Sequence, residues 1–214
     1  MDAAREERVR QHGILAKRQP EEYCKGVSAR AYLLDFLGSV SGRTVLDLGC
    51  GYNPTPVLFA LWGASHVYAC DVSPRAIALQ VAVAQQAGVA DRVSGTVCAA
   101  ERLPFRGEQI DLVHGAGVLH HLRLPLAAPE IVRVLRKGGK AGFRDPLGHN
   151  ALLEFARDYL PYRWKHAEKA TDRPLRLKDI EQFGRHFSDF EYRGFHLLTM
   201  LAIAMTTEFG TEFA

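Results

Sequence analysis

Residues 44–54 read Thr-Val-Leu-Asp-Leu-Gly-Cys-Gly-Tyr-Asn-Pro, and this stretch decides the fold. The short apolar run Thr44–Leu48 is typical of a buried parallel strand, and the glycines that follow it predict a tight turn. A helix should begin at Thr55-Pro56, because threonine can cap a helix and proline is tolerated in its first turn. The stretch therefore predicts a strand, a tight turn and a helix, which is the opening of a βαβ unit.

The same alternation continues to residue 144. We expect helices at about 28–37, 73–88 and 126–136, and strands at 66–70, 92–98, 110–114 and 140–144. Short apolar strands alternating with helices predict an α/β fold, a doubly wound and mostly parallel sheet with Rossmann-like crossovers.

The chain divides into four expected parts. Residues 1–40 form a cap of N-terminal helices, including one at 2–18, and 41–147 form the core. Residues 148–180 are predicted to be a helical lid insertion. Residues 181–214 should complete the sheet, with a sixth strand at 190–198 and little room for a seventh.

Composition points to a soluble globular protein. The chain has 214 residues, 47% hydrophobic and 24% charged, with a net charge of +3. So small an excess of positive charge argues against a nucleic-acid partner. The apolar run 197–205 is too short to span a bilayer, and the charged first twenty residues do not resemble a signal peptide, so we expect a cytoplasmic protein. The four cysteines lack metal-site spacing and are interpreted as reduced, structural thiols, so no metal is predicted.

Three kinds of nucleotide loop compete for the glycine turn. A P-loop is excluded because no Lys-Ser/Thr follows the glycines. A dinucleotide fingerprint needs a third glycine where Pro54 stands, which leaves a nicotinamide dehydrogenase as a weak alternative. A cofactor without phosphates, with its amino-acid portion against Gly49–Gly51, fits best, and Asp47 would suit its ammonium group.

Asp71 follows the second strand and lies 20 residues after Gly51. A carboxylate at this point can accept hydrogen bonds from both hydroxyls of a ribose. The alternative is that Asp71 only caps the helix that begins at Ser73-Pro74. Because the glycine loop stands at the right distance, the spacing favours the ribose role.

Six segments in order resemble the class I S-adenosylmethionine-dependent methyltransferases, in particular the small-molecule branch typified by the type 11 methyltransferase domain. The segments are Val45–Gly51, Cys70–Pro74, Ala100–Phe105, Ile110–Val113, Val118–Leu122 and Val134–Gly139. The resemblance covers about residues 40–147 and implies a seven-stranded sheet and S-adenosyl-L-methionine as cofactor.

The resemblance also implies roles for residues along the cofactor. The methionine end would lie against Asp47, Gly49, Cys50 and Gly51, and the ribose against Asp71 and Val72. The adenine would lie against Ala100 and Glu101, and the sulfonium above Gly115–Val118, in contact with Gly115 and Val118. Two positions depart from the family pattern. Asn53-Pro54 stands where a glycine is common, and Ala99 where an acidic residue often contacts the adenine amine.

The methyl acceptor is predicted to be a small molecule, because motifs typical of nucleic-acid and protein-arginine methyltransferases are missing. His120 or His121, oriented by Asp145, is the candidate general base for a hydroxyl acceptor, as in some relatives that the chain resembles. A purely structural role for the two histidines is the alternative, and His149 and Asn150 are secondary candidates. N- or C-methylation and a degenerate scaffold subunit remain as rival functions.

Residues 157–178 carry seven basic and three acidic side chains. This excess is explained either by a solvated helical face or by a lid that attracts an anionic acceptor. A homodimer is left open, and stable insertion into a membrane is not expected.

Overall fold

The computed structural model describes residues 19–24, 28–148 and 174–195. The chain divides into two compact units, residues 1–145 and 146–214, and each is described by itself. The helix predicted at 2–18 and most of the predicted lid, 149–173, lie outside the described residues. Within the described part of the chain, no helix is long and apolar enough to cross a membrane.

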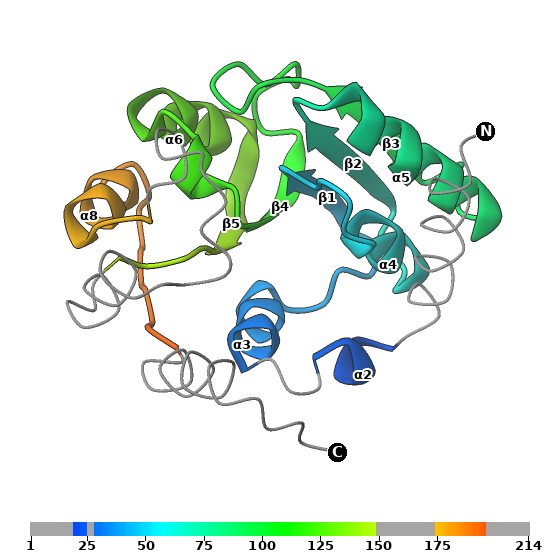
Figure 1. Cartoon of the computed structure of the whole chain (residues 1–214), viewed down its shortest axis with the longest axis horizontal. Helices are drawn as coiled ribbons and strands as arrows, with labels where there is room; N and C mark the ends of the chain where they lie inside the picture. The colour runs from blue at the N-terminus through cyan, green and yellow to red at the C-terminus, as the bar shows by residue number, and fades with distance from the viewer. Residues whose placement is uncertain (1–18, 25–27, 149–173, 196–214) are drawn as a thin grey trace, which may run out of the picture. The chain divides into compact units, whose positions relative to one another are not determined.

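The first unit is built on a parallel sheet of five strands (Figure 1). The strands are β1 (Thr44–Leu48), β2 (His66–Asp71), β3 (Val93–Val97), β4 (Ile110–Ala116) and β5 (Leu135–Arg144). Their order in the sheet is β3-β2-β1-β4-β5, and every neighbouring pair is parallel. The predicted doubly wound α/β fold is confirmed.

Two helices precede the first strand, and the others lie between β1 and β2, between β2 and β3, and between β4 and β5. They are α2 (Pro20–Cys24), α3 (Ser28–Leu37), α4 (Thr55–Leu61), α5 (Pro74–Gln86), the 3-10 helix η1 (Leu119–His121) and α6 (Leu124–Val134). One hydrophobic cluster joins α3, α4 and α5 to the strands through Leu37, Phe59 and Val83, which pack with Val45 and Val67. This packing holds both β1 and α4 in place, and so it fixes the two ends of the loop that joins them.

Helix α5 shows how the local sequence sets an element's start. The Ser73 side chain accepts a hydrogen bond from the Ala76 amide at 3.3 Å, and Pro74 occupies the first turn, where its missing N–H costs nothing. Both features were visible in the sequence. They place Asp71 just before the helix, at the end of β2.

The predicted strand at 190–198 is wrong over 190–195, where the backbone has no strand. The helix α8 (Leu177–Gly184) precedes this segment. A β-carbon at Gly184 would lie 2.4 Å from Phe190 Cδ1, so the ring packs onto the helix at a glycine. The described part of this segment thus packs on α8 through Phe190.

We expect Glu130→Gln to lower the free energy of unfolding near neutral pH by about 1 kcal/mol. The Glu130 carboxylate accepts hydrogen bonds from the Arg133 guanidinium and, at 2.8 Å, from the Leu103 amide, and these hold its pKa below the ordinary value. A depressed folded-state pKa gives stability that is present above the unfolded-state pKa and lost as pH falls through the folded-state pKa. Denaturant unfolding of the unaltered chain and of Glu130→Gln at neutral and acidic pH measures this loss. The difference in unfolding free energy between the two chains should disappear in acid.

Candidate cofactor and acceptor site

The predicted site residues gather at the carboxyl edge of the sheet, at the point where the strand order reverses. Strand β1 lies between β2 and β4, and the chain leaves β1 and β4 toward opposite edges of the sheet. In doubly wound sheets ligands bind in the crevice at this switch point. The glycine loop follows β1, Asp71 ends β2, Gly117 follows β4 and Asp145 follows β5.

The two glycines of the loop serve different purposes. Both have positive φ, +66° at Gly49 and +50° at Gly51, a region that other residues rarely adopt. A β-carbon at Gly49 would lie 2.4 Å from Val118 Cγ2, so this glycine permits close packing of the loop on the chain after β4. Among the described residues, a β-carbon at Gly51 would meet only the Gly49 carbonyl oxygen, at 4.0 Å. The space on this side of Gly51 is therefore open, although its amide and carbonyl are hydrogen-bonded to Asp71 and Gln80.

Asp71 is held in place by the backbone around it. Its Oδ2 accepts a hydrogen bond from the Gly51 amide at 2.9 Å, and its Oδ1 accepts one from the Ser73 amide at 2.8 Å. A carboxylate has about four acceptor positions, so both oxygens retain capacity for ligand hydroxyls. The side chain of Val72 next to it is 71% exposed. These features fit a ribose at Asp71 with an apolar surface beside it.

Gln80, which no sequence motif identifies, binds the glycine loop from helix α5. This fully buried side chain donates from Nε2 to the Gly51 carbonyl at 3.0 Å and to the Asn53 carbonyl at 2.6 Å. The Gln80 side chain therefore stabilises the loop at Asn53-Pro54, where the sequence departs from the family pattern. Pro54 serves as the N-cap residue of α4. A polar residue on the apolar face of a predicted helix was the available signal.

Replacing Gln80 with leucine should loosen this loop. Two loop carbonyls, at the half-buried Gly51 and the exposed Asn53, would lose their donor, so we expect the free energy of unfolding to fall by about 1–3 kcal/mol. We also expect S-adenosylhomocysteine to bind about tenfold more weakly, because the Gly51 backbone is no longer held. Denaturant unfolding and calorimetric titration measure the two effects. Gln85→Leu, at an exposed position of the same helix, is the matched control, and equal binding by both variants would exclude the role of Gln80.

Asp47 is more deeply buried than a direct contact with the cofactor's ammonium group requires. Its side chain is buried, with 2% of the residue exposed, and its Oδ1 lies 2.5 Å from His114 Nδ1. The His114 ring also meets Phe59 edge-on, with ring centroids 5.2 Å apart. The carboxylate thus ties β1 to β4 beneath the loop. A direct contact of Asp47 with an ammonium group stays a prediction.

The remaining predicted cofactor residues line the same edge in different ways. Cys50 and Ala100 are buried, and the Cys50 amide donates to the Cys70 carbonyl at 3.0 Å. A β-carbon at Gly115 would lie 2.6 Å from Phe143 Cδ1, so this glycine allows β4 and β5 to pack closely. Glu101 accepts a hydrogen bond from the Arg123 amide at 3.0 Å. Its carboxylate therefore has a structural partner, and its contact with an adenine stays a prediction.

The structure brings His120 and Asp145 together. His120 Nδ1 lies 2.7 Å from Asp145 Oδ1, and their side chains are only 7% and 4% exposed. Since a carboxylate can only accept, Nδ1 carries the hydrogen and the lone pair of the neutral ring lies on Nε2. The His120 amide also donates to Oδ1, at 3.2 Å. This pair has the geometry of an oriented histidine base.

His121 and the second oxygen of Asp145 complete the acceptor side of the site. The rings of His120 and His121 lie 3.9 Å apart between centroids, and His121 is exposed. Asp145 Oδ2 is buried and has no hydrogen-bond partner among the described residues. A buried carboxylate oxygen without a donor is costly, so a ligand hydroxyl or ammonium at this point would satisfy it. His149 and Asn150 lie outside the described residues.

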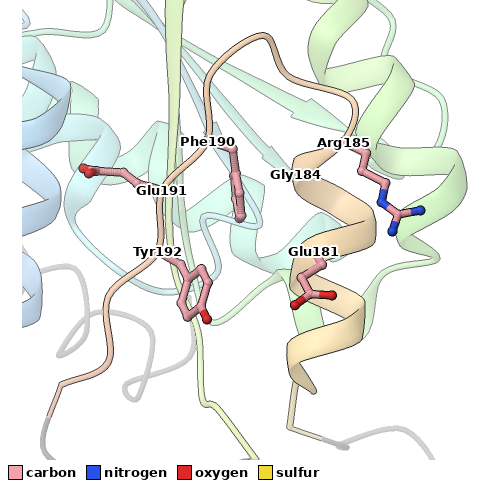
Figure 2. Close-up of a pocket in the computed structure, with 6 residues that line it drawn as sticks. All are labelled: Glu181, Gly184, Arg185, Phe190, Glu191 and Tyr192. Atoms are coloured by element: carbon pink, nitrogen blue, oxygen red, sulfur yellow. The ribbon is translucent and has the colours of Figure 1, made fainter.

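A separate surface pocket lies in the second unit (Figure 2). Its lining residues are Glu181, Gly184 and Arg185 of α8 and Phe190, Glu191 and Tyr192 of the segment after it. Figure 2 shows the Phe190 ring facing the helix and the Arg185 side chain pointing away from that ring. None of the site residues predicted from the sequence lines this pocket.

Comparison with known proteins shows that the core is similar to methyltransferases, as the sequence motifs predict. Residues 46–143 match the family model described as a methyltransferase domain. The chain is 34% identical over 115 residues to a malonyl-[acyl-carrier protein] O-methyltransferase of Herminiimonas arsenicoxydans, covering 53% of this chain and 41% of that protein. It is 32% identical over 178 residues to a phthiotriol/phenolphthiotriol dimycocerosates methyltransferase of Mycobacterium leprae, covering 82% and 62% respectively.

Among solved structures, the chain resembles geranyl diphosphate C-methyltransferase from Streptomyces coelicolor A3(2), with a TM-score of 0.51 and 22% identity over 56% of this chain and 45% of that one. At this identity the likeness shows the fold. The chain spans less than two thirds of the length of these curated relatives. Residues 46–143 of the chain therefore match a methyltransferase domain, and this core is similar to the class I S-adenosylmethionine-dependent methyltransferases.

Proposed function

We propose that this protein transfers a methyl group from S-adenosylmethionine to a small-molecule acceptor. The observation that carries the proposal is the open space beside Gly51 next to the Asp71 carboxylate, whose Oδ2 accepts a hydrogen bond from the Gly51 amide at 2.9 Å. This arrangement offers a backbone surface to an amino-acid chain and hydrogen-bond acceptors to a ribose, without the lysine or third glycine that phosphates need. The bound cofactor would supply a methyl group activated by a sulfonium.

The acceptor atom that we propose is a hydroxyl oxygen. Methyl transfer is an in-line displacement, and a hydroxyl must also lose its proton to become a good nucleophile. His120 Nε2 would take this proton, and Asp145 would hold the ring in the required tautomer and stabilise its charged form. The buried Oδ2 of Asp145 would accept a hydrogen bond from the acceptor. The oxygen assignment rests on this oriented base, which suits a hydroxyl that must lose its proton as it attacks; methylation of a carbon also releases a proton, so the C-methylation alternative is separated by the assay and not by this geometry.

The relatives' names leave the acceptor open, because they include an O-methyltransferase and a C-methyltransferase. Four further features stay proposals. Residues 148–180 would form a lid, and the basic residues of 157–178 would attract an anionic acceptor. The protein would be cytoplasmic and would form a homodimer. N- or C-methylation of a metabolite is the second candidate. A scaffold subunit without catalysis is the third, and failure to bind the cofactor would favour it.

Incubation with labelled S-adenosylmethionine and a panel of hydroxylated, amino and anionic metabolites tests the proposal. We expect methyl transfer to at least one hydroxylated compound. Transfer only to amines or carbons would contradict the oxygen assignment, and binding of cofactor with no transfer to any compound would contradict the choice of acceptor classes.

A further inference from the structure

The His114 side chain contacts the elements on both sides of the glycine loop. It belongs to β4, where its backbone is paired with Asp47 of β1, and its Nδ1 lies 2.5 Å from Asp47 Oδ1. The same ring meets Phe59 of α4 edge-on, with ring centroids 5.2 Å apart. Strand β1 leads into the glycine loop and α4 follows it. One side chain therefore helps to hold both ends of this loop.

His114 also stands directly before the second loop of the proposed site. Gly115 follows it in β4 and is paired with Leu48, the last residue of β1. Beyond this pair the two loops approach each other closely, since a β-carbon at Gly49 would lie 2.4 Å from Val118 Cγ2. A shift of β4 relative to β1 would therefore displace one loop relative to the other.

The contact between Asp47 and His114 is buried. The two side chains are 3% and 7% exposed, respectively. Since a carboxylate can only accept, His114 Nδ1 carries the hydrogen and donates it. Within the described part of the chain, no other group donates a hydrogen bond to the Asp47 carboxylate. His114 is therefore the residue that orients this carboxylate and ties it to β4.

We propose that His114 is a positioning residue that sets the affinity of the site for the amino-acid end of the proposed cofactor. It acts through the Asp47 carboxylate and through the spacing of the two loops. The amino-acid end is expected at the glycine loop, whereas the nucleoside is expected at Asp71 and Ala100, which follow different strands. Losing the His114 hydrogen bond should therefore weaken binding of one end of the ligand and spare the other. This inference rests on the proposed function.

Two ligands separate the ends of the cofactor. S-adenosylhomocysteine carries the amino-acid end, and methylthioadenosine has the same nucleoside and thioether without it. His114→Phe keeps an aromatic ring beside Phe59 but removes the donor to Asp47. We expect this variant to bind S-adenosylhomocysteine about tenfold more weakly or worse, because a hydrogen bond to a charged group is lost at that end. Its affinity for methylthioadenosine should stay within about twofold of that of the unaltered chain.

Calorimetric titration of the folded chains measures both affinities, and competition against S-adenosylhomocysteine gives that of the weaker ligand. A merely structural role of His114 would weaken both ligands alike. Equal losses for the two ligands, or no loss for either, would overturn the proposal.

His114→Asn is the conservative variant. Its amide can still donate to the Asp47 carboxylate, so we expect it to bind S-adenosylhomocysteine clearly more tightly than His114→Phe does. The same loss in both variants would overturn the role of the hydrogen bond. Asp71→Ala is the opposite control, because both ligands carry the ribose and both should bind more weakly to it.

If His114→Phe does not fold, because a buried carboxylate is left without a donor, proton NMR of the unaltered chain decides. The hydrogen on His114 Nδ1 should give its own downfield signal, assigned with isotope-labelled histidine and by its loss in His114→Asn. We expect this signal to shift when S-adenosylhomocysteine is added and to stay in place with methylthioadenosine. No shift with S-adenosylhomocysteine, or the same shift with both ligands, would contradict the proposal.

Failure of the proposed function gives a different result. If the unaltered chain binds neither ligand, the cofactor assignment is contradicted and the role of His114 is contradicted with it. If the unaltered chain binds both ligands and His114→Phe weakens both equally, only the role of His114 is contradicted.

Discussion

Asp71→Ala is expected to abolish measurable binding of S-adenosylhomocysteine. The change removes the proposed acceptor of the ribose hydroxyls, and hydrogen bonds to a charged group contribute about 1.5–3 kcal/mol each. Losing two of them weakens binding by about two to four orders of magnitude. The Gly51 and Ser73 amides, 2.9 Å and 2.8 Å from the carboxylate oxygens, lose their acceptor as well. Calorimetric titration of the folded variant measures the effect.

Two further variants show whether that loss is specific. Asp71→Asn keeps the shape and one acceptor oxygen, so we expect it to bind more weakly than the unaltered chain and more tightly than Asp71→Ala. Asp91→Ala removes an exposed carboxylate from the turn before β3 and should leave affinity unchanged. Unchanged affinity in Asp71→Ala, with its fold verified by circular dichroism, would contradict the ribose assignment.

His120→Ala is expected to reduce the turnover number by about two to four orders of magnitude, the usual contribution of a general base. Cofactor affinity should change little, because the proposed cofactor contacts do not include the imidazole. Asp145→Asn should reduce turnover as well. An amide can donate to Nδ1, which would move the hydrogen to Nε2 and remove the lone pair that receives the acceptor's proton. Steady-state kinetics with the acceptor found in the screen measures both changes.

His121→Ala is the matched control for the base. His121 stacks on His120 but is exposed, so we expect a loss of less than about tenfold. A larger loss in His121→Ala than in His120→Ala would move the base to His121. If neither variant slows the reaction tenfold, positioning of the two substrates is sufficient and the acceptor needs no base.

The core of the fold could be predicted because each of its elements carries a local signal. Apolar runs identify the strands, and Ser73-Pro74 identifies the start of a helix. The positions of Asp71 and of the glycine loop followed from the rule that parallel strands end at the same edge. The contact between His120 and Asp145 could be anticipated for the same reason, since both residues follow strands that are neighbours in the sheet.

The remaining features depend on contacts between distant residues, which local patterns do not encode. Gln80 reaches the loop across 29 positions in sequence, and nothing in its helix predicts that its amide binds two loop carbonyls. Glu101 is bound by the Arg123 amide, a pairing visible only after the chain has folded. The strand expected at 190–198 is absent over 190–195, because a run with several aromatic residues does not show whether they pack on a sheet or, as Phe190 does, on a helix.

Calorimetric titration of the purified chain with S-adenosylhomocysteine tests the central claim most directly. NADH and NADPH are the controls, because a dinucleotide would be the ligand if the glycine loop bound pyrophosphate. We predict micromolar binding of S-adenosylhomocysteine and no binding of either dinucleotide. Binding of a dinucleotide instead, or no binding of any of the three ligands, would contradict the proposal that this protein transfers methyl groups.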